Sequence, residues 1–179
     1  MAWTAPRTWV TTEVVSASIM NTHVRDNLLE TAPAKAASAG QYFMATAANT
    51  ITVRTLNSDF INTAETTAST SYTDLATTGC TVSATLSTRA IVSITARISN
   101  DTVAAESFIG VDLSGANTAS ASDNFALQQE GGSANEAVQM SYVAVQTGLN
   151  AGSTTFTMKY RVTAGTGTFH RRRLMVMPF

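Results

Sequence analysis

The 179-residue chain has few residues that could crosslink it or bind a metal, with one cysteine and two histidines. Cys80 has no second cysteine to pair with, so an internal disulfide is excluded and a small buried apolar side chain is expected. A transition-metal site needs a cluster of cysteine or histidine ligands, and the sequence has none. We therefore expect no metal and no cofactor. A chain of this length can build a core without them.

Charged residues are also scarce, at 13% of the chain, against a usual share of about 25%. Threonine, serine and alanine take their place. Eleven basic and twelve acidic residues give a net charge of −1, which argues against nucleic acid as a partner. The weakly charged, threonine-rich surface has two interpretations. The subunit packs against copies of itself, or it is a β-protein whose exposed strand positions are threonine.

Long apolar runs are absent from the sequence. No run approaches the length that spans a membrane, and the N-terminus lacks the basic-then-apolar pattern of a signal peptide. We therefore expect no membrane partner. The expected route is synthesis in the cytoplasm, followed by incorporation into a larger assembly that carries the protein out.

Signatures of catalysis are missing as well. The sequence has neither a G-x-S-x-G nor an H-E-x-x-H motif, so neither His23 nor His170 belongs to one. A carboxylate pair for glycoside hydrolysis can be assembled from distant strands. The candidates for such a pair are Glu106, Asp112, Glu130 and Glu136. Nothing in the sequence distinguishes any of them, so we expect that the protein is not an enzyme and has no catalytic residues.

Alternation of apolar and polar residues with a period of two dominates residues 68–179 and predicts the main domain. It is clearest at residues 155–162, where every second side chain is apolar. The same pattern predicts strands at residues 82–86, 90–99, 107–113, 124–129, 138–146 and 168–177. Turn-rich segments separate these strands. About eight short strands predict an antiparallel two-sheet sandwich, most simply a jelly roll.

Residues 1–31 predict an N-terminal docking arm that carries one short amphipathic helix at about residues 17–30. Ser16 or Ser18 can cap the start of this helix, and Pro33 would prevent its extension. Its apolar stripe recurs every four residues, at Met20, Val24 and Leu28. A helix of this length is marginal in water by itself, so the stripe needs a partner surface.

Both tryptophans, Trp3 and Trp9, precede the helix on the extended part of the arm. They predict anchors that dock into a groove, and the alternative is that they fold back onto the same subunit's sandwich. Residues 32–67 follow as an alanine-rich linker and a small β-hairpin, with its turn at residues 48–50. A hairpin of this size must pack against a neighbour to be stable.

The N-terminal segment TWVTTEVVSASIMNTHVRDNLL, at residues 8–29, resembles the N-terminal signature of small structural proteins of tailed bacteriophages and of prophages in Gram-positive bacteria. The resemblance continues through GQYFMATAANTITVR, SYTDLATTGCTVSATL and the C-terminal TFTMKYRVTAGTGTFHRRRLMVMPF. It therefore covers most of the chain, through packing and turn residues with no chemical signature. It implies a component of the virion surface: a head decoration protein, a head fibre or a tail-associated fibre.

The C-terminal strand adds evidence for subunit contacts. Residues 174–179 alternate between two faces that are both apolar, which fits a central strand or a subunit interface. Within the same predicted strand, Arg171, Arg172 and Arg173 predict inter-subunit salt bridges. We expect a homo-oligomer, and analogy with trimeric jelly rolls of virions favours a trimer.

Taken together, the residues and the resemblance favour a non-enzymatic capsid decoration or head-fibre protein. Its arm would dock on the major capsid protein or another virion protein, and its sandwich would face outward. The alternative is a tail-associated receptor-binding protein that contacts glycans on the host surface. The predicted loop tips at residues 115–122 and 131–135 contain no aromatic residues, which disfavours carbohydrate binding.

Overall fold

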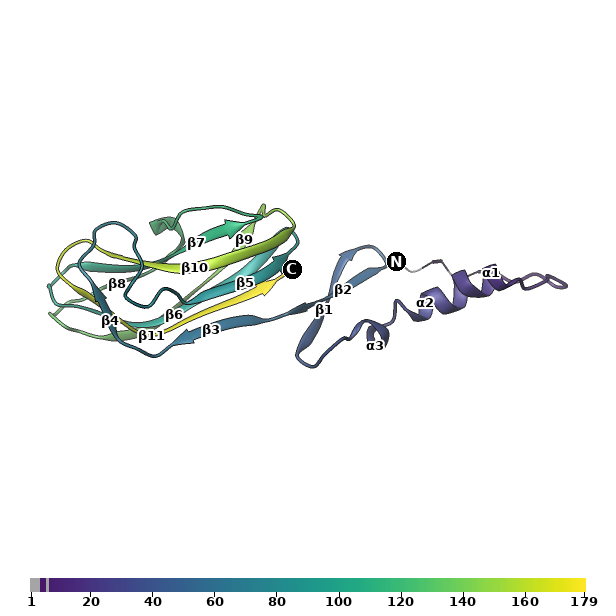
Figure 1. The fold of residues 1–179 in the computed structure, drawn as a ribbon, viewed down its shortest axis with the longest axis horizontal. Helices are drawn as coiled ribbons and strands as arrows, with labels where there is room; N and C mark the ends of the chain where they lie inside the picture. Colours follow the sequence, from purple (N-terminus) through teal and green to yellow (C-terminus); the bar gives the residue numbers. More distant parts are fainter. Residues whose placement is uncertain (1–3, 6) are drawn as a thin grey trace. The chain divides into compact units, whose positions relative to one another are not determined.

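The computed structural model describes residues 4, 5 and 7–179. The chain divides into two compact units, Met1–Thr55 and Leu56–Phe179, called here the N-terminal unit and the sandwich. Most regular structure is antiparallel β-structure, and short helices and a hairpin precede the sandwich in the sequence (Figure 1). The predicted fold class is confirmed.

The helical segment of the N-terminal unit runs from Ala17 to Leu28. It consists of α1 (Ala17–Met20), a π-helical turn (Asn21–Arg25) and α2 (Asp26–Leu28). Ser16 caps it, since its Oγ accepts a hydrogen bond from the backbone N–H of Ile19 at 3.3 Å. A separate short helix, α3 (Ala32–Lys35), contains Pro33 near its start, so the first helix has already ended before the proline. None of the helices described is long and apolar enough to cross a membrane.

The hairpin pairs β1 (Gln41–Ala47) with β2 (Thr50–Thr55). Asn49 takes a positive φ of 56° in the connecting turn, a conformation that asparagine tolerates better than most residues. A bulge between Ala45 and Ala47 adjusts the register next to the turn. The hairpin predicted for residues 32–67 is present, and it belongs to the N-terminal unit.

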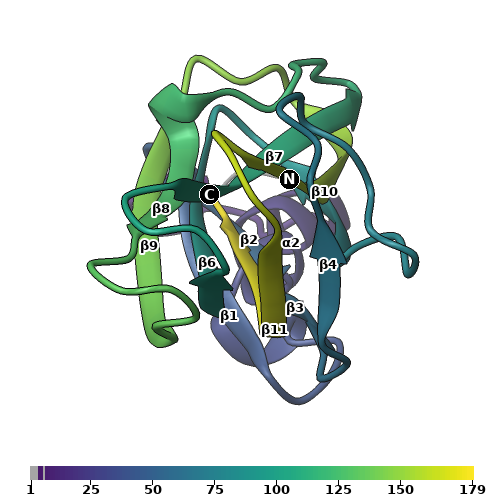
Figure 2. The same ribbon diagram turned by 90° about the vertical axis from the view of Figure 1, so that its left-hand side faces the viewer.

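The sandwich consists of two antiparallel sheets (Figure 2). The first has the order β3–β11–β6–β9, formed by β3 (Asn57–Ile61), β11 (Gly167–Pro178), β6 (Arg89–Asn100) and β9 (Val138–Thr147). Short β4 (Glu65–Thr67) pairs with the beginning of β11. The second sheet has the order β5–β10–β7–β8, formed by β5 (Thr81–Leu86), β10 (Gly152–Val162), β7 (Glu106–Gly115) and β8 (Ala126–Glu130).

The strand order defines the topology. When β3 and β4 are counted together as the first strand, the two sheets have the orders 1-8-3-6 and 2-7-4-5. Consecutive strands therefore cross repeatedly between the sheets, which is the arrangement of a jelly roll with two Greek keys. Among the consecutive strands described for the sandwich, only β7 and β8 pair with each other. The other pairings join strands that are not consecutive, so long-range pairing closes the core.

The core lies between the two sheets and follows the alternation in the sequence. In β5 and β10 every second residue is buried, and the same holds for most of β6. Tyr160 of β10 and Phe169 of β11 contact each other across the core, with ring centroids 5.0 Å apart. Burial of each large apolar side chain stabilises the fold by about 1.5–3 kcal/mol. Cys80 is fully buried among them, as expected for a small apolar residue.

The sandwich begins earlier than residue 68, the start that the sequence predicts. Both β3 and β4 pair with β11 and belong to the first sheet. Their sequences, NSDFI and ETT, contain residues that are rare in strands and show little apolar alternation. Pairing with β11 therefore imposes the strand conformation, and this pairing involves residues a hundred or more positions away.

Candidate interaction surfaces

The apolar stripe of the helical segment is exposed in the N-terminal unit. Met20, Val24 and Leu28 are 44%, 39% and 61% exposed, and Trp9 is 46% exposed. Trp9 is accompanied by Arg7, whose guanidinium lies 5.6 Å from the indole centroid. Trp3 lies outside the described residues. The docking role of these side chains stays a prediction, and their exposure leaves them accessible to a partner.

One residue of the helical segment that the sequence did not single out holds the start of the arm. The Asn27 side chain accepts a hydrogen bond from the Thr4 N–H at 2.8 Å and donates to the Thr4 carbonyl at 3.2 Å. It is also buried, unlike the residues of the stripe. Asparagine side chains readily bond to backbone groups, which is the only signal in the sequence for this role. The two hydrogen bonds fix the extended arm against the helix.

A second surface is the outer face of the sheet β3–β11–β6–β9, the side turned away from the core. Its apolar half follows the register of the three long strands: Met177 lies opposite Ile91, and Ile91 lies opposite Val145. Val143 and Val145 of β9 are 60% and 55% exposed. The prediction that the C-terminal strand has two apolar faces is confirmed, because Leu174 and Val176 face the core while Met175 and Met177 face outward.

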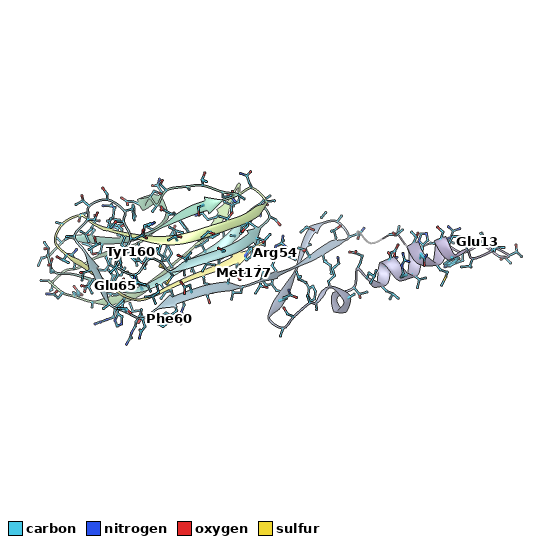
Figure 3. All side chains as sticks on the ribbon, in the orientation of Figure 1. Glu13, Arg54, Phe60, Glu65, Tyr160 and Met177 are labelled. Carbon is cyan, nitrogen blue, oxygen red and sulfur yellow. The ribbon has the colours of Figure 1, made fainter. Side chains whose placement is uncertain are left out.

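The other half of this outer face is basic. Arg97 of β6 and Arg171 and Arg173 of β11 are exposed there, and we call these three residues the basic patch. Phe60 of β3 lies beside them on the outside of the sandwich (Figure 3), with the Arg173 guanidinium 4.9 Å from its ring centroid. A hollow of about 350 Å³ opens at this place. It is lined by Phe60, Asn62, Thr95, Gln139, Arg171 and Arg173.

Arg172 contradicts the prediction of an inter-subunit contact, because its side chain is fully buried inside its own sandwich. A β-bulge causes this. His170 pairs with Arg97 and Arg173 with Thr95, so Arg171 and Arg172 together oppose Ala96. Arg171 takes a positive φ of 50° at the bulge. The extra residue reverses the alternation, which turns Arg172 toward the core and leaves Arg171 and Arg173 outside.

The buried guanidinium of Arg172 joins three segments of the sandwich. Its Nη2 lies 2.8 Å from Glu65 Oε2 in β4, and its Nη1 lies 3.4 Å from the Tyr160 hydroxyl in β10. The Arg172 carbonyl also accepts a hydrogen bond from the Cys80 thiol at 3.1 Å. Burial raises the pKa of the Tyr160 hydroxyl, so Tyr160 stays neutral and donates to the Gly79 carbonyl. Figure 3 shows Glu65 and Tyr160 within the sandwich. This is a structural cluster and not an interface.

The pKa of Glu65 reflects two opposing effects. Burial raises it, while hydrogen bonds from Thr77 and the charge of Arg172 lower it. The lowering effects are larger together, so the pKa lies below the usual value for glutamate. Glu65 is therefore ionised at neutral pH and forms a charged pair with Arg172.

The outer face of the second sheet differs, because its cations are neutralised within the chain. Arg161 lies 4.0 Å from the Phe108 ring centroid and donates to Asp123 through Nε at 2.9 Å. The Arg161 guanidinium holds the pKa of Asp123 below its usual range. Lys159 pairs with Asp74 at 2.7 Å. A polar hollow of about 590 Å³ lies beside Lys159. The lining consists of Asp112, Leu113, Ser114, Thr118, Ala119, Ser120, Thr157 and Lys159.

Of the four carboxylates considered for glycoside hydrolysis, Asp112 alone lines either of the two hollows described above. Glu106 and Glu130 lie directly opposite each other on β7 and β8. Asp112 lines the polar hollow, where it accepts a hydrogen bond from the Ala121 N–H at 2.6 Å. Glu136 accepts one from the Gly132 N–H at 2.9 Å in the loop after β8. Among the described residues, no group of three or more histidine, cysteine or acidic side chains could hold a metal ion.

No protein-family model and no curated protein matches the chain. Among solved structures, the Eiger TNF from S. frugiperda is similar at 11% sequence identity with a TM-score of 0.48. The similarity covers 69% of this chain and 91% of that chain.

Proposed function

We propose that the protein is a non-enzymatic structural component of a bacteriophage particle, most specifically a capsid decoration or head-fibre protein. The N-terminal unit docks on the major capsid protein or another virion protein, and the sandwich forms the outward part of a homotrimer. The observation that carries this proposal is the difference between the two compact units of the chain. One compact unit displays an unpartnered apolar stripe, and the other forms its own complete core.

The exposed stripe supports attachment through the N-terminal unit. Met20, Val24 and Leu28 place three apolar side chains on a capped helical segment, with Trp9 exposed on the adjoining arm. Apolar side chains of this kind, and tryptophan above all, contribute a large part of the binding energy at interfaces. The apolar half of the outer face of sheet β3–β11–β6–β9 supports the homotrimer in the same way.

A decoration protein stabilises its particle because it binds the assembled shell and not the dispersed subunits. A trimer strengthens this binding further, since three linked arms act at a high effective concentration. We therefore expect particles that lack the protein to assemble normally but to release DNA at a lower temperature or under milder osmotic shock. Adsorption to host cells should be unchanged. The measurements are DNA release during heating and adsorption of intact and deficient particles.

The alternative is a tail-associated protein that binds host glycans, and the polar hollow beside Lys159 favours it. Serine and threonine hydroxyls, Asp112 and Lys159 line this hollow and offer donors and acceptors for sugar hydroxyls. Under this alternative, deficient particles would have heads of normal stability and would no longer adsorb. The same pair of measurements therefore separates the two functions.

A further inference from the structure

The basic patch has no anionic partner within the described part of its own chain. Lys159, Arg161 and Arg172 of the sandwich each pair with a carboxylate within 4.0 Å. Arg97, Arg171 and Arg173 form no such pair with any described carboxylate. Three positive charges therefore gather on one half of a sheet face whose other half is mainly apolar, with Arg89 of β6 as a further cation at its far end. A surface of this composition fits a partner that is itself partly apolar and negatively charged.

The sandwich carries such a surface elsewhere, at the ends of β7 and β8 and in the loop that follows. We call Glu106, Glu130 and Glu136 the acidic corner. Glu106 and Glu130 are direct cross-strand neighbours, and like charges in this arrangement destabilise a sheet. Glu130 and Glu136 are exposed, as are the apolar Val103 and Val138 nearby in the chain. The loop is held in place, because the Asn135 N–H bonds to the Asn100 carbonyl and the Ala104 N–H to the Gly131 carbonyl.

The acidic corner lies at an open edge of the sandwich. β8 is the last strand of one sheet and β9 the last strand of the other, and the two lie on the same side (Figure 2). An edge strand presents unpaired backbone groups and is a natural site for contact with another chain. The basic patch, by contrast, lies on β6 and β11, in the interior of its sheet.

We propose that the acidic corner and the β8–β9 edge of one copy dock against the outer face of sheet β3–β11–β6–β9 of a second copy. Glu130 and Glu136 then face Arg171 and Arg173 of the neighbour. The two surfaces differ, so the contact is heterologous, and repetition with a suitable rotation closes a ring. The contact rests on the proposed homo-oligomer and specifies which surfaces form it.

Charge balance favours a second copy over another anionic ligand. The basic patch contributes three arginines and the acidic corner three glutamates, so the contact neutralises both surfaces without any further molecule. It also places positive charge beside Glu106 and Glu130, which relieves their mutual repulsion. The apolar half of the face, including Val143 and Met177, contributes the buried area that a stable contact requires.

The test is a charge-reversal exchange on the full chain, with mass measured by light scattering and sedimentation over a range of concentrations. The wild-type protein is expected to be oligomeric at micromolar concentration. Arg171→Glu with Arg173→Glu should raise the dissociation constant by at least about tenfold, and so should Glu130→Arg with Glu136→Arg. A mixture of the two variants, or all four substitutions in one chain, should recover most of the lost association. Thr85→Glu, an exposed position on β5, is the matched control and should leave the mass unchanged.

The outcomes separate this contact from the oligomer itself. A wild-type oligomer that both reversals leave intact overturns the proposed contact while the oligomer stands. Reversals that dissociate the protein without recovery in the mixture also overturn it, because the arginines and glutamates then do not face each other. A monomeric wild type contradicts the proposed homo-oligomer and this contact with it. Circular dichroism and thermal unfolding of each variant show whether a loss of association reflects misfolding.

Discussion

Replacement of Arg172 by alanine is expected to lower the free energy of unfolding of the sandwich by about 3–5 kcal/mol. The Arg172 side chain is fully buried, and its loss leaves Glu65 without its cation and the Tyr160 hydroxyl without a donor. An unpaired charge in a poorly hydrated site is strongly destabilising. Urea denaturation monitored by far-UV circular dichroism measures the effect. Tryptophan fluorescence would not report on the sandwich, since both tryptophans lie in the N-terminal unit.

The neighbouring arginine provides the matched control. Arg173→Ala removes the same kind of side chain from an exposed position one residue away. We expect it to change the free energy of unfolding by no more than about 0.5 kcal/mol. Equal effects of the two substitutions would contradict the role assigned to the bulge at Arg171.

Removal of both charges separates the cost of an unpaired ion from the net contribution of the pair. The double substitution Arg172→Met with Glu65→Leu should be less destabilising than Arg172→Met by itself, because no charge is left unpaired.

The ion pair between Arg172 and Glu65 also predicts a pH dependence of stability. The folded state lowers the pKa of Glu65, so its stabilising contribution is complete above the usual glutamate range and is lost as the pH falls through the folded pKa. Glu65→Gln should remove this part of the acid sensitivity.

Deletion of residues 1–55 is expected to abolish binding to the particle and to leave the sandwich folded. The sandwich has its own closed core, and the boundary between the two compact units falls at residue 55. Deletion therefore removes the exposed helical stripe and Trp9 and none of the core residues of the sandwich. Co-sedimentation with particles that lack the protein measures binding, and thermal unfolding measures the integrity of the sandwich.

Single substitutions in the N-terminal unit test the same attachment more finely. Trp9→Ala should weaken particle binding by about 2 kcal/mol, since a tryptophan docked in an interface commonly contributes at least this much. Val53→Ala, in the hairpin of the same unit, is the control for general loss of structure.

The deletion has two contrary outcomes. If the sandwich without residues 1–55 is unfolded, the N-terminal unit is part of the folding unit. If that sandwich still binds the particle, attachment lies in the sandwich.

The helix and most strands could be predicted because they depend on local properties of the sequence. Ser16 caps the helix as one of two predicted candidates, and the alternation at residues 155–162 places four side chains of β10 in the core. The spacing of apolar residues that distinguishes an amphipathic helix from a strand can be read directly from the sequence. The same holds for the two-sided apolar C-terminal strand, β11, which lies between long β6 on one side and short β3 and β4 on the other.

Three features depended on tertiary structure. β3 and β4 are strands only because β11 pairs with them, although their own residues disfavour strands. Alternation along the strand separates Arg172 from Arg171 and Arg173, but the bulge at Arg171 is what lets both Phe169 and Arg172 face the core, and no local pattern predicts that bulge. The basic patch and the acidic corner each collect residues from distant segments. Apart from β3 and β4, local sequence determined which segments are helix or strand and which faces are apolar. Long-range pairing decided register and the sides on which charges gather, because a one-residue change in register moves every following side chain to the opposite face.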